Sequence, residues 1–134
     1  MDCVIDTNVL VYEMVEDSEL HSAAAAALKK VTKRIIPTIV LEELVYALMQ
    51  LGVTDSIIKK KLEELLNSEW NQIIPIVPMH MQGAMEVLAR HKTSFRRFND
   101  KVILSTAKTE QVPLITFDRE LLAECKKEGV DTIP

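Results

Sequence analysis

Glycine is scarce in this chain of 134 residues, which contains only Gly52, Gly83 and Gly129. Each is isolated, and none falls where a short apolar run passes into a helical pattern. P-loop and dinucleotide-binding motifs require several glycines at such a turn, because the backbone must come close to a phosphate group. The scarcity of glycine therefore excludes both nucleotide-binding motifs.

Cysteine is nearly absent as well. The two cysteines, Cys3 and Cys125, lie at opposite ends of the chain and form no CxxC pair. The histidines, which show no spacing typical of metal ligands, are His21, His80 and His91. These absences exclude a disulfide framework and a zinc site built from cysteine or histidine. Cys3 falls in a predicted buried strand, so we interpret it as a core thiol of a protein in a reducing cytosol.

Long apolar runs are also missing, although 48% of the residues are hydrophobic. A membrane-spanning helix needs about 20 consecutive apolar residues, and no segment of the sequence comes near that length. Asp2 follows Met1 directly, without the basic and apolar regions of a secretory signal. We therefore expect a cytoplasmic protein that has no membrane partner.

The sequence has no excess of positive charge. Its 16 Lys and Arg residues oppose 20 Asp and Glu residues, which gives a formal net charge of −4. This balance argues against nucleic-acid binding by bulk electrostatics. Several of the acidic residues, however, are candidates for one metal site. With a metal bound there, the rest of the surface would be close to neutral, and local patches would decide what binds.

Short apolar runs alternate with segments of helical periodicity along the whole chain, with no linker, repeat or low-complexity segment. This alternation predicts a single α/β domain over residues 1–134, a three-layer α/β/α architecture with a central parallel sheet. Thr54 and Asn99 suit helix N-caps, and Gly52 and Gly129 suit helix ends. The predicted strands are 3–6, 34–37, 73–77, 113–116 and 131–133. The predicted helices are 20–31, 38–51, 54–67, 79–91, 99–110 and 119–128.

Four acidic positions fall where such a fold would gather them. Asp6 and Asp118 come at the ends of predicted strands, and Asp100 lies in the first turn of a predicted helix, on its core-facing stripe. The fourth position is Glu42 or Glu43. In open α/β sheets, ligands bind beyond the carboxyl ends of the strands. Because gathered carboxylates repel one another, and Mg²⁺ or Mn²⁺ usually neutralises an all-oxygen cluster, we expect a metal site that handles phosphates.

Each of these residues also has a purely structural interpretation. Asp6 and Asp118 suit turns or helix N-caps, and the glutamate pair suits a solvated helix face. Periodicity does not choose between Glu42 and Glu43, since they flank the apolar stripe of helix 38–51 on different sides. The expected co-location of the four positions is what favours a functional interpretation.

The same residues carry a resemblance to a known family. The order and spacing of four segments, which together span the chain, resemble those of a PIN domain, and the Thr-x-Asp after a strand is fairly specific. The segments are Val4-Ile5-Asp6-Thr7-Asn8, Val40-Leu41-Glu42-Glu43-Leu44, Asn99-Asp100 followed by Ile103 and Ala107, and Leu114-Ile115-Thr116-Phe117-Asp118.

The resemblance implies a role for each matched residue. It implies that the catalytic and metal-binding residues are Asp6, Glu43, Asp100 and Asp118, with Asn8 and Thr116 as supporting polar residues. Glu43 is favoured over Glu42 because the family glutamate commonly precedes leucine in an Ala-Glu-Leu context, although Glu42 stands in place of that alanine.

The compact size is similar to that of VapC-type toxins of prokaryotic toxin–antitoxin pairs. The resemblance therefore implies an endoribonuclease dependent on Mg²⁺ or Mn²⁺, with an RNA substrate, a cognate antitoxin and a homodimer that uses helices 38–51 and 54–67. Two alternatives stay open. One is an RNA-processing nuclease outside such a pair, and the other is a non-catalytic interaction module that has kept the fold.

A basic stretch over residues 90–101 leads into the third carboxylate. Its cations could neutralise phosphates and its two phenylalanines could stack on unpaired bases, which makes Arg96, Arg97 and Lys101 candidate RNA contacts. Equally, Phe95 and Phe98 could belong to the core, and the basic residues could merely make a loop soluble.

Overall fold

A five-stranded parallel sheet forms the centre of the computed structural model, which describes residues 1–133. The central strand β1 is buried on both faces, and its residues Cys3, Val4 and Ile5 have no exposed surface. Continuous apolar runs of this kind are typical of strands covered by helices on both sides. In the order in which they lie, the strands are β3 (Asn71–Ile74), β2 (Lys33–Pro37), β1 (Asp2–Ile5), β4 (Leu114–Ile115) and β5 (Thr132–Ile133).

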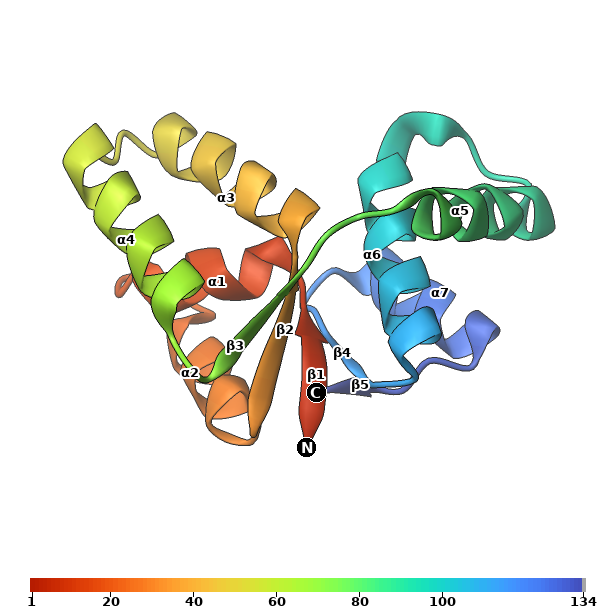
Figure 1. Cartoon of the computed structure of the whole chain (residues 1–134), viewed down its shortest axis with the longest axis horizontal. Helices are drawn as coiled ribbons and strands as arrows, with labels where there is room; N and C mark the ends of the chain where they lie inside the picture. The colour runs from red at the N-terminus through yellow and green to blue at the C-terminus, as the bar shows by residue number, and fades with distance from the viewer. Residues whose placement is uncertain (134) are drawn as a thin grey trace.

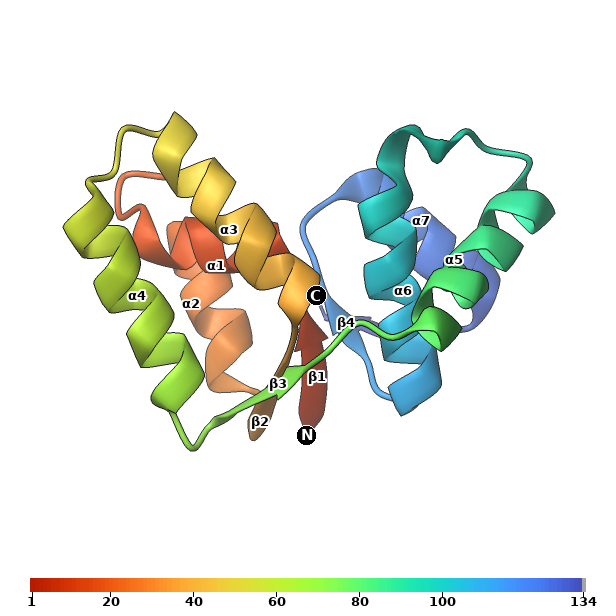
Figure 2. The same ribbon diagram turned by 45° about the horizontal axis from the view of Figure 1, so that its top comes forward.

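Seven α-helices flank the sheet over the described residues. The first four lie on one side of the sheet and the last three on the other (Figures 1 and 2). A short 3-10 helix, η1 (Phe95–Arg97), precedes α6. The helices on the first side are α1 (Thr7–Met14), α2 (His21–Lys29), α3 (Thr38–Gln50) and α4 (Asp55–Asn67), and those on the second are α5 (Pro78–His91), α6 (Phe98–Glu110) and α7 (Arg119–Glu128).

The strand order places a switch point beside β1. The chain adds β2 and β3 on one side of β1 and then crosses to add β4 and β5 on the other. At such a reversal, the connections leave the carboxyl ends of the two central strands in opposite directions and open a crevice between them. Figure 2 shows α3 and α6 on either side of this end of β1. The side chains that follow β1 and β4 therefore meet in this crevice.

The three-layer architecture and the parallel sheet confirm the fold expected from the sequence. The helix α1 was not expected, because the segment Thr7–Met14 is apolar at most positions and shows no clear helical stripe. Strand β3 ends at Ile74, so the strand expected over 73–77 is confirmed at 73 and 74 only. Pro75, which follows, has no N–H to donate to a ladder. Asn99 is not an N-cap, because α6 begins at Phe98 and its N-cap position is Arg97.

Two of the histidines make polar contacts within the second group of helices. His80 is buried, and its Nδ1 accepts a hydrogen bond from the backbone N–H of Val77 at the start of α5. His91 lies with its Nε2 2.8 Å from a carboxylate oxygen of Glu128, which joins α5 to α7. Across residues 1–133, none of the helices is long and apolar enough to cross a membrane.

Candidate active site

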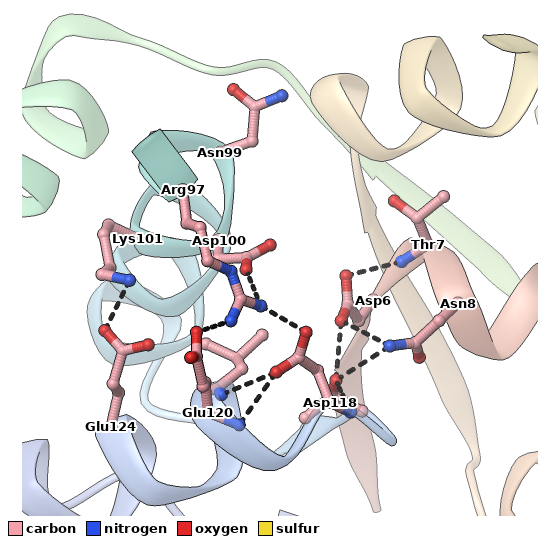
Figure 3. Close-up of polar contacts among 12 residues, drawn as sticks. Asp6, Thr7, Asn8, Arg97, Asn99, Asp100, Lys101, Asp118, Glu120 and Glu124 are labelled. Atoms are coloured by element: carbon pink, nitrogen blue, oxygen red, sulfur yellow. Dashed lines mark hydrogen bonds and ion pairs between the residues drawn. The ribbon is translucent and has the colours of Figure 1, made fainter. Parts of the chain in front are cut away.

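Asp6 is held at the carboxyl end of β1 by polar groups from the start of α1 and from the turn after β4. Its Oδ1 accepts a hydrogen bond from the backbone N–H of Thr7 at 2.7 Å, which caps α1. Its Oδ2 accepts the hydroxyl of Thr116 at 2.6 Å and the amide of Asn8 at 3.2 Å (Figure 3). The Asp6 residue is only 5% exposed. Asp6 is thus a helix N-cap, which confirms its structural interpretation, and it also lines the cavity in the crevice.

Thr116 links two of the carboxylate positions. Besides donating to Asp6, its fully buried hydroxyl accepts the backbone N–H of Asp118 at 3.1 Å. Asn8 completes the connection, since its Oδ1 accepts the backbone N–H of Phe117 at 3.3 Å. The Thr-x-Asp turn after β4 is therefore fixed against the end of β1 by side chains rather than by the sheet ladder.

Glu43 approaches the crevice from α3. Its Oε1 accepts the hydroxyl of Thr7 at 2.7 Å, and its Oε2 accepts the side-chain amide of Asn99 at 3.2 Å. Both of its oxygens are thus oriented by groups from α1 and α6. Glu42 is exposed and does not line the cavity described below, so the structure places Glu43 rather than its neighbour beside Asp6.

Asp100 and Asp118 both contact the Arg97 guanidinium (Figure 3). One nitrogen, Nη2, contacts Oδ2 of both aspartates, and the other, Nη1, contacts Oε2 of Glu120. Asp118 is also the N-cap of α7, since its Oδ1 accepts the backbone N–H groups of Glu120 and Leu121. The structural interpretation of Asp118 is therefore correct for one oxygen, while the other faces the crevice.

One open cavity of about 450 Å³ joins these groups. All four predicted acidic residues line it, together with Arg97 and with apolar and aromatic residues of α1 and α3. The lining residues are Asp6, Thr7, Asn8, Val11, Tyr12, Glu43, Tyr46, Ala47, Gln50, Arg97, Asp100 and Asp118.

Burial and crowding disfavour ionisation in this cavity. Loss of solvation raises the pKa of Asp6 to about 7, with the charge of Asp100 adding to the rise and the Thr116 hydrogen bond opposing it. Burial likewise raises the pKa of Asp100, and Arg97 offsets part of that rise. Burial acts to lower the pKa of Arg97, but Asp100 and Asp118 together hold it above its usual range. A divalent cation bound among these carboxylates would lower the pKa of Asp6 and of Asp100 and so favour their ionised forms.

The donor set fits Mg²⁺ or Mn²⁺ in kind, because the four side chains offer only carboxylate oxygens. Their arrangement differs from the expected one. Within residues 1–133, no three acidic, histidine or cysteine side chains lie close enough together to hold an ion. Oδ2 of Asp100 and Oδ2 of Asp118 already have a cationic partner, because both contact the Arg97 guanidinium.

The basic stretch before α6 divides into exposed and buried parts. Arg96 is exposed, and so is Phe95, which lies beside the half-buried Phe98 with 5.6 Å between ring centres. Lys101 is 3% exposed, and its ammonium lies 2.6 Å from a carboxylate oxygen of Glu124, so its contact with RNA stays a prediction. The core interpretation of Phe95 is wrong, since this residue is exposed.

Sequence reasoning missed three residues of the site. Thr7 and Asn99 orient Glu43, and Arg97 was expected at an RNA surface rather than among the carboxylates. The spacing of Arg97 three residues before Asp100 could have predicted their ion pair, because side chains three residues apart are neighbours on a helix. Thr7 and Asn99 gave no signal beyond their place inside the quoted motifs.

One family model and several solved structures are similar to this chain. The family model described as PIN domain matches residues 3–127, and nucleases of this family generally use divalent metals. The structure of VapC20 from Mycobacterium tuberculosis, described as a Sarcin-Ricin loop cleaving toxin, is similar with a TM-score of 0.78 and 16% identity. That match covers 90% of this chain and 93% of the other.

Two further structures are similar over nearly the whole of both chains. VapBC2 from Rickettsia felis, bound to a DNA fragment from its promoter, gives a TM-score of 0.71 at 23% identity over 99% of this chain and 98% of the other. The structure of FitAcB from Neisseria gonorrhoeae gives a TM-score of 0.73 at 17% identity, over 100% of this chain and 97% of the other. A comparison with curated proteins found no match. Because the family match spans nearly the whole chain and the fold agrees with these structures, the chain belongs to the PIN domain family.

Proposed function

We propose that this protein is an endoribonuclease that hydrolyses RNA phosphodiester bonds with Mg²⁺ or Mn²⁺. The observation that carries the proposal is the placement of Asp6, Glu43, Asp100 and Asp118 around one open cavity at the switch point of the sheet. Carboxylates in such a place are costly unless a ligand compensates them. The similarity to a toxin described as cleaving the Sarcin-Ricin loop supports RNA as the substrate.

The four carboxylates would hold the divalent cation. When bound, the cation would stabilise charge on the scissile phosphate and make a water molecule acidic enough to attack it in line. Thr116 and Asn8 restrict Asp6 to one orientation, and Thr7 and Asn99 do the same for Glu43. Such hydrogen bonds from neighbouring side chains commonly decide metal affinity.

RNA would reach the cavity across the basic stretch before α6. Arg96 is exposed there, and Phe95 offers an exposed ring on which an unpaired base could stack. Among the described residues, Arg97 is the one cationic side chain that lines the cavity itself. These residues give a short positive segment on a chain whose net charge is negative.

A partner of antitoxin type and a homodimer are also part of the proposal. A similar structure is described as a toxin–antitoxin complex from Klebsiella pneumoniae, and the cavity continues from the carboxylates onto Tyr12 and Tyr46, where an antitoxin segment could bind. Exposed apolar side chains on α3 and α4, such as Met49 and Ile57, would suit a contact between two copies.

The test is a pair of measurements on one set of variants. Calorimetric titration with Mn²⁺ should detect binding that Asp6→Asn weakens, and a labelled single-stranded RNA should be cut with Mn²⁺ but not with EDTA. Asp131→Asn, which makes the same change at an exposed position, should behave like wild type. Cleavage that survives EDTA, or equal Mn²⁺ binding by all three proteins, would refute the metal site.

Two alternatives predict different results in the same assays. An RNA-processing nuclease outside a toxin–antitoxin pair would cut RNA in vitro but would not arrest growth when expressed in cells. A non-catalytic interaction module would bind no Mn²⁺ and cut nothing. The presence of all four carboxylates favours an active nuclease over the module.

A further inference from the structure

The position of Arg97 raises a question that the proposed nuclease activity leaves open. Its guanidinium contacts Asp100, Asp118 and Glu120, and two of these are proposed metal ligands. The Arg97 side chain is 30% exposed, and the Asp100 side chain is 19% exposed. A guanidinium bound between two carboxylates supplies the positive charge that a divalent cation would otherwise supply there.

Two cations cannot both neutralise the same pair of oxygens at close range. They repel each other, and a guanidinium contacting Oδ2 of both aspartates blocks access to those atoms. Arg97 therefore occupies the two oxygens of Asp100 and Asp118 that a cation bound there would need.

The structure also offers the guanidinium another location. A neighbouring hollow of about 430 Å³ shares Arg97 with the cavity of the carboxylates and is lined in addition by Arg96, Glu120 and Lys127. Glu120 lines only this second hollow, and its side chain is 70% exposed. By keeping its contact with Glu120, Arg97 can leave Asp100 and Asp118 without losing every acidic partner.

We propose that Arg97 is an internal counter-ion of the metal-free enzyme, which must move from between Asp100 and Asp118 toward Glu120 before a divalent cation binds. This inference rests on the proposed function. It has a consequence for the substrate as well. Once the aspartates hold the metal, Arg97 has lost two of its three carboxylate partners and is free to contact a phosphate of the RNA beside them.

The experiment compares Mn²⁺ affinity in wild type, Arg97→Met and Arg96→Met by calorimetry. Both variants remove one positive charge and keep an unbranched side chain, but only Arg97 contacts the aspartates. If Arg97 competes with the metal, Arg97→Met should bind Mn²⁺ roughly tenfold more tightly than wild type, a factor typical of coupled binding. Arg96→Met should change the affinity by much less.

A second readout separates competition from a purely structural role. In EDTA, Arg97→Met should unfold at a lower temperature than wild type, because its aspartates have lost their counter-ion. The rise in that temperature on adding Mn²⁺ should be larger than in wild type. RNA cleavage by the same variant should be slower despite its tighter metal binding, since the phosphate contact is gone.

The outcomes distinguish this inference from the proposed function. If wild type binds Mn²⁺ and cuts RNA, while Arg97→Met binds Mn²⁺ no more tightly than Arg96→Met, the counter-ion role is refuted and the nuclease proposal stands. If none of the proteins binds Mn²⁺, both are refuted. An Arg97→Met variant that binds more tightly and cuts more slowly supports the inference.

Discussion

The hydroxyl of Thr116 donates a 2.6 Å hydrogen bond to Oδ2 of Asp6, although 110 positions separate the two residues. The bond joins the ends of β1 and β4, the strands at which the sheet reverses its order. The same oxygen of Thr116 accepts the backbone N–H of Asp118. One buried side chain thus sets the relative positions of two candidate metal ligands.

Replacing this hydroxyl by a methyl group should damage both stability and metal binding. Thr116→Val leaves Asp6 and the Asp118 N–H without their partner, which should cost about 1–3 kcal/mol in the free energy of unfolding. Urea denaturation measures this loss, and calorimetry should show weaker Mn²⁺ binding. Thr106→Val is the matched control, because Thr106 is fully buried and donates only to the backbone oxygen of Val102. Equal Mn²⁺ affinities in the two variants would show that Thr116 does not position the site.

The metal-free protein should become less stable as the pH rises toward neutrality. Burial raises the pKa of Asp6 to about 7 in the folded protein, while an unfolded aspartate titrates near 3.9. Between these values the folded state binds more protons than the unfolded state, so the free energy of unfolding falls with pH and levels off above about 7. The loss should be on the order of a few kcal/mol.

Asp6→Asn removes the titrating group and should remove this loss. Urea denaturation in EDTA at pH 5 and pH 8 measures the difference, and Asp131→Asn should keep the wild-type dependence. If Asp6→Asn and wild type lose the same amount between the two pH values, the carboxyl of Asp6 is not the group responsible. A variant that is more stable at pH 8 but unable to bind Mn²⁺ would show that the site is maintained at the expense of stability.

The parts of this molecule that the sequence predicted depend on local composition. Continuous β-branched and apolar runs such as Val4-Ile5 identified the buried strands, and the carboxyl ends of parallel strands identified Asp6 and Asp118 as neighbours. The helix α1 was not predicted because its apolar residues lie on all sides of the helix axis and form no stripe. The sequence suggested an N-cap at Asp6 only as the structural interpretation of that residue.

The position of Arg97 could not be read from the sequence, because it depends on tertiary distances. Its guanidinium joins Asp100 to Asp118 only because the 3-10 turn of η1 sets it at the start of α6, opposite the Thr-x-Asp turn. Lys101 is the opposite case, since a lysine expected at the surface is buried against Glu124. Charged residues of one stretch thus have different roles. The role of each depends on the residue with which it pairs in the fold, and sequence spacing does not reveal that partner.

Glu43 and Glu42 should differ sharply in their importance for cleavage. Glu43→Gln changes a side chain that lines the cavity and accepts bonds from Thr7 and Asn99, so RNA cleavage should fall by at least about a hundredfold. Glu42→Gln makes the same change on the exposed neighbour and should keep most of the activity. Measuring the cleavage rates of both variants on one labelled RNA tests this prediction. If Glu42→Gln is the slower variant, α3 presents Glu42 to the substrate.

RNA affinity should fall with rising salt, and Arg96 and Arg97 should account for part of the slope. In a Glu43→Gln background, which should bind RNA without cutting it, replacing either arginine by alanine should flatten log K against log[salt] by about one unit per lost contact. Lys59→Ala is the control, because Lys59 is an exposed residue of α4 that pairs with Glu63 and lies outside the basic stretch. This variant should leave the slope unchanged. An unaltered slope in both arginine variants would remove the basic stretch from the RNA path.

Cleavage should leave a 5′-phosphate and a 3′-hydroxyl. The proposed function places a divalent cation on the four carboxylates that line the cavity, and such a cation makes a bound water acidic enough to attack the phosphate. An external water therefore is the expected nucleophile, and the 3′ oxygen is the leaving group. Mass spectrometry of the fragments distinguishes the two routes. A 2′,3′-cyclic phosphate would mean that the 2′-hydroxyl attacks, and the assignment of the carboxylates to a metal-assisted hydrolysis would have to be withdrawn.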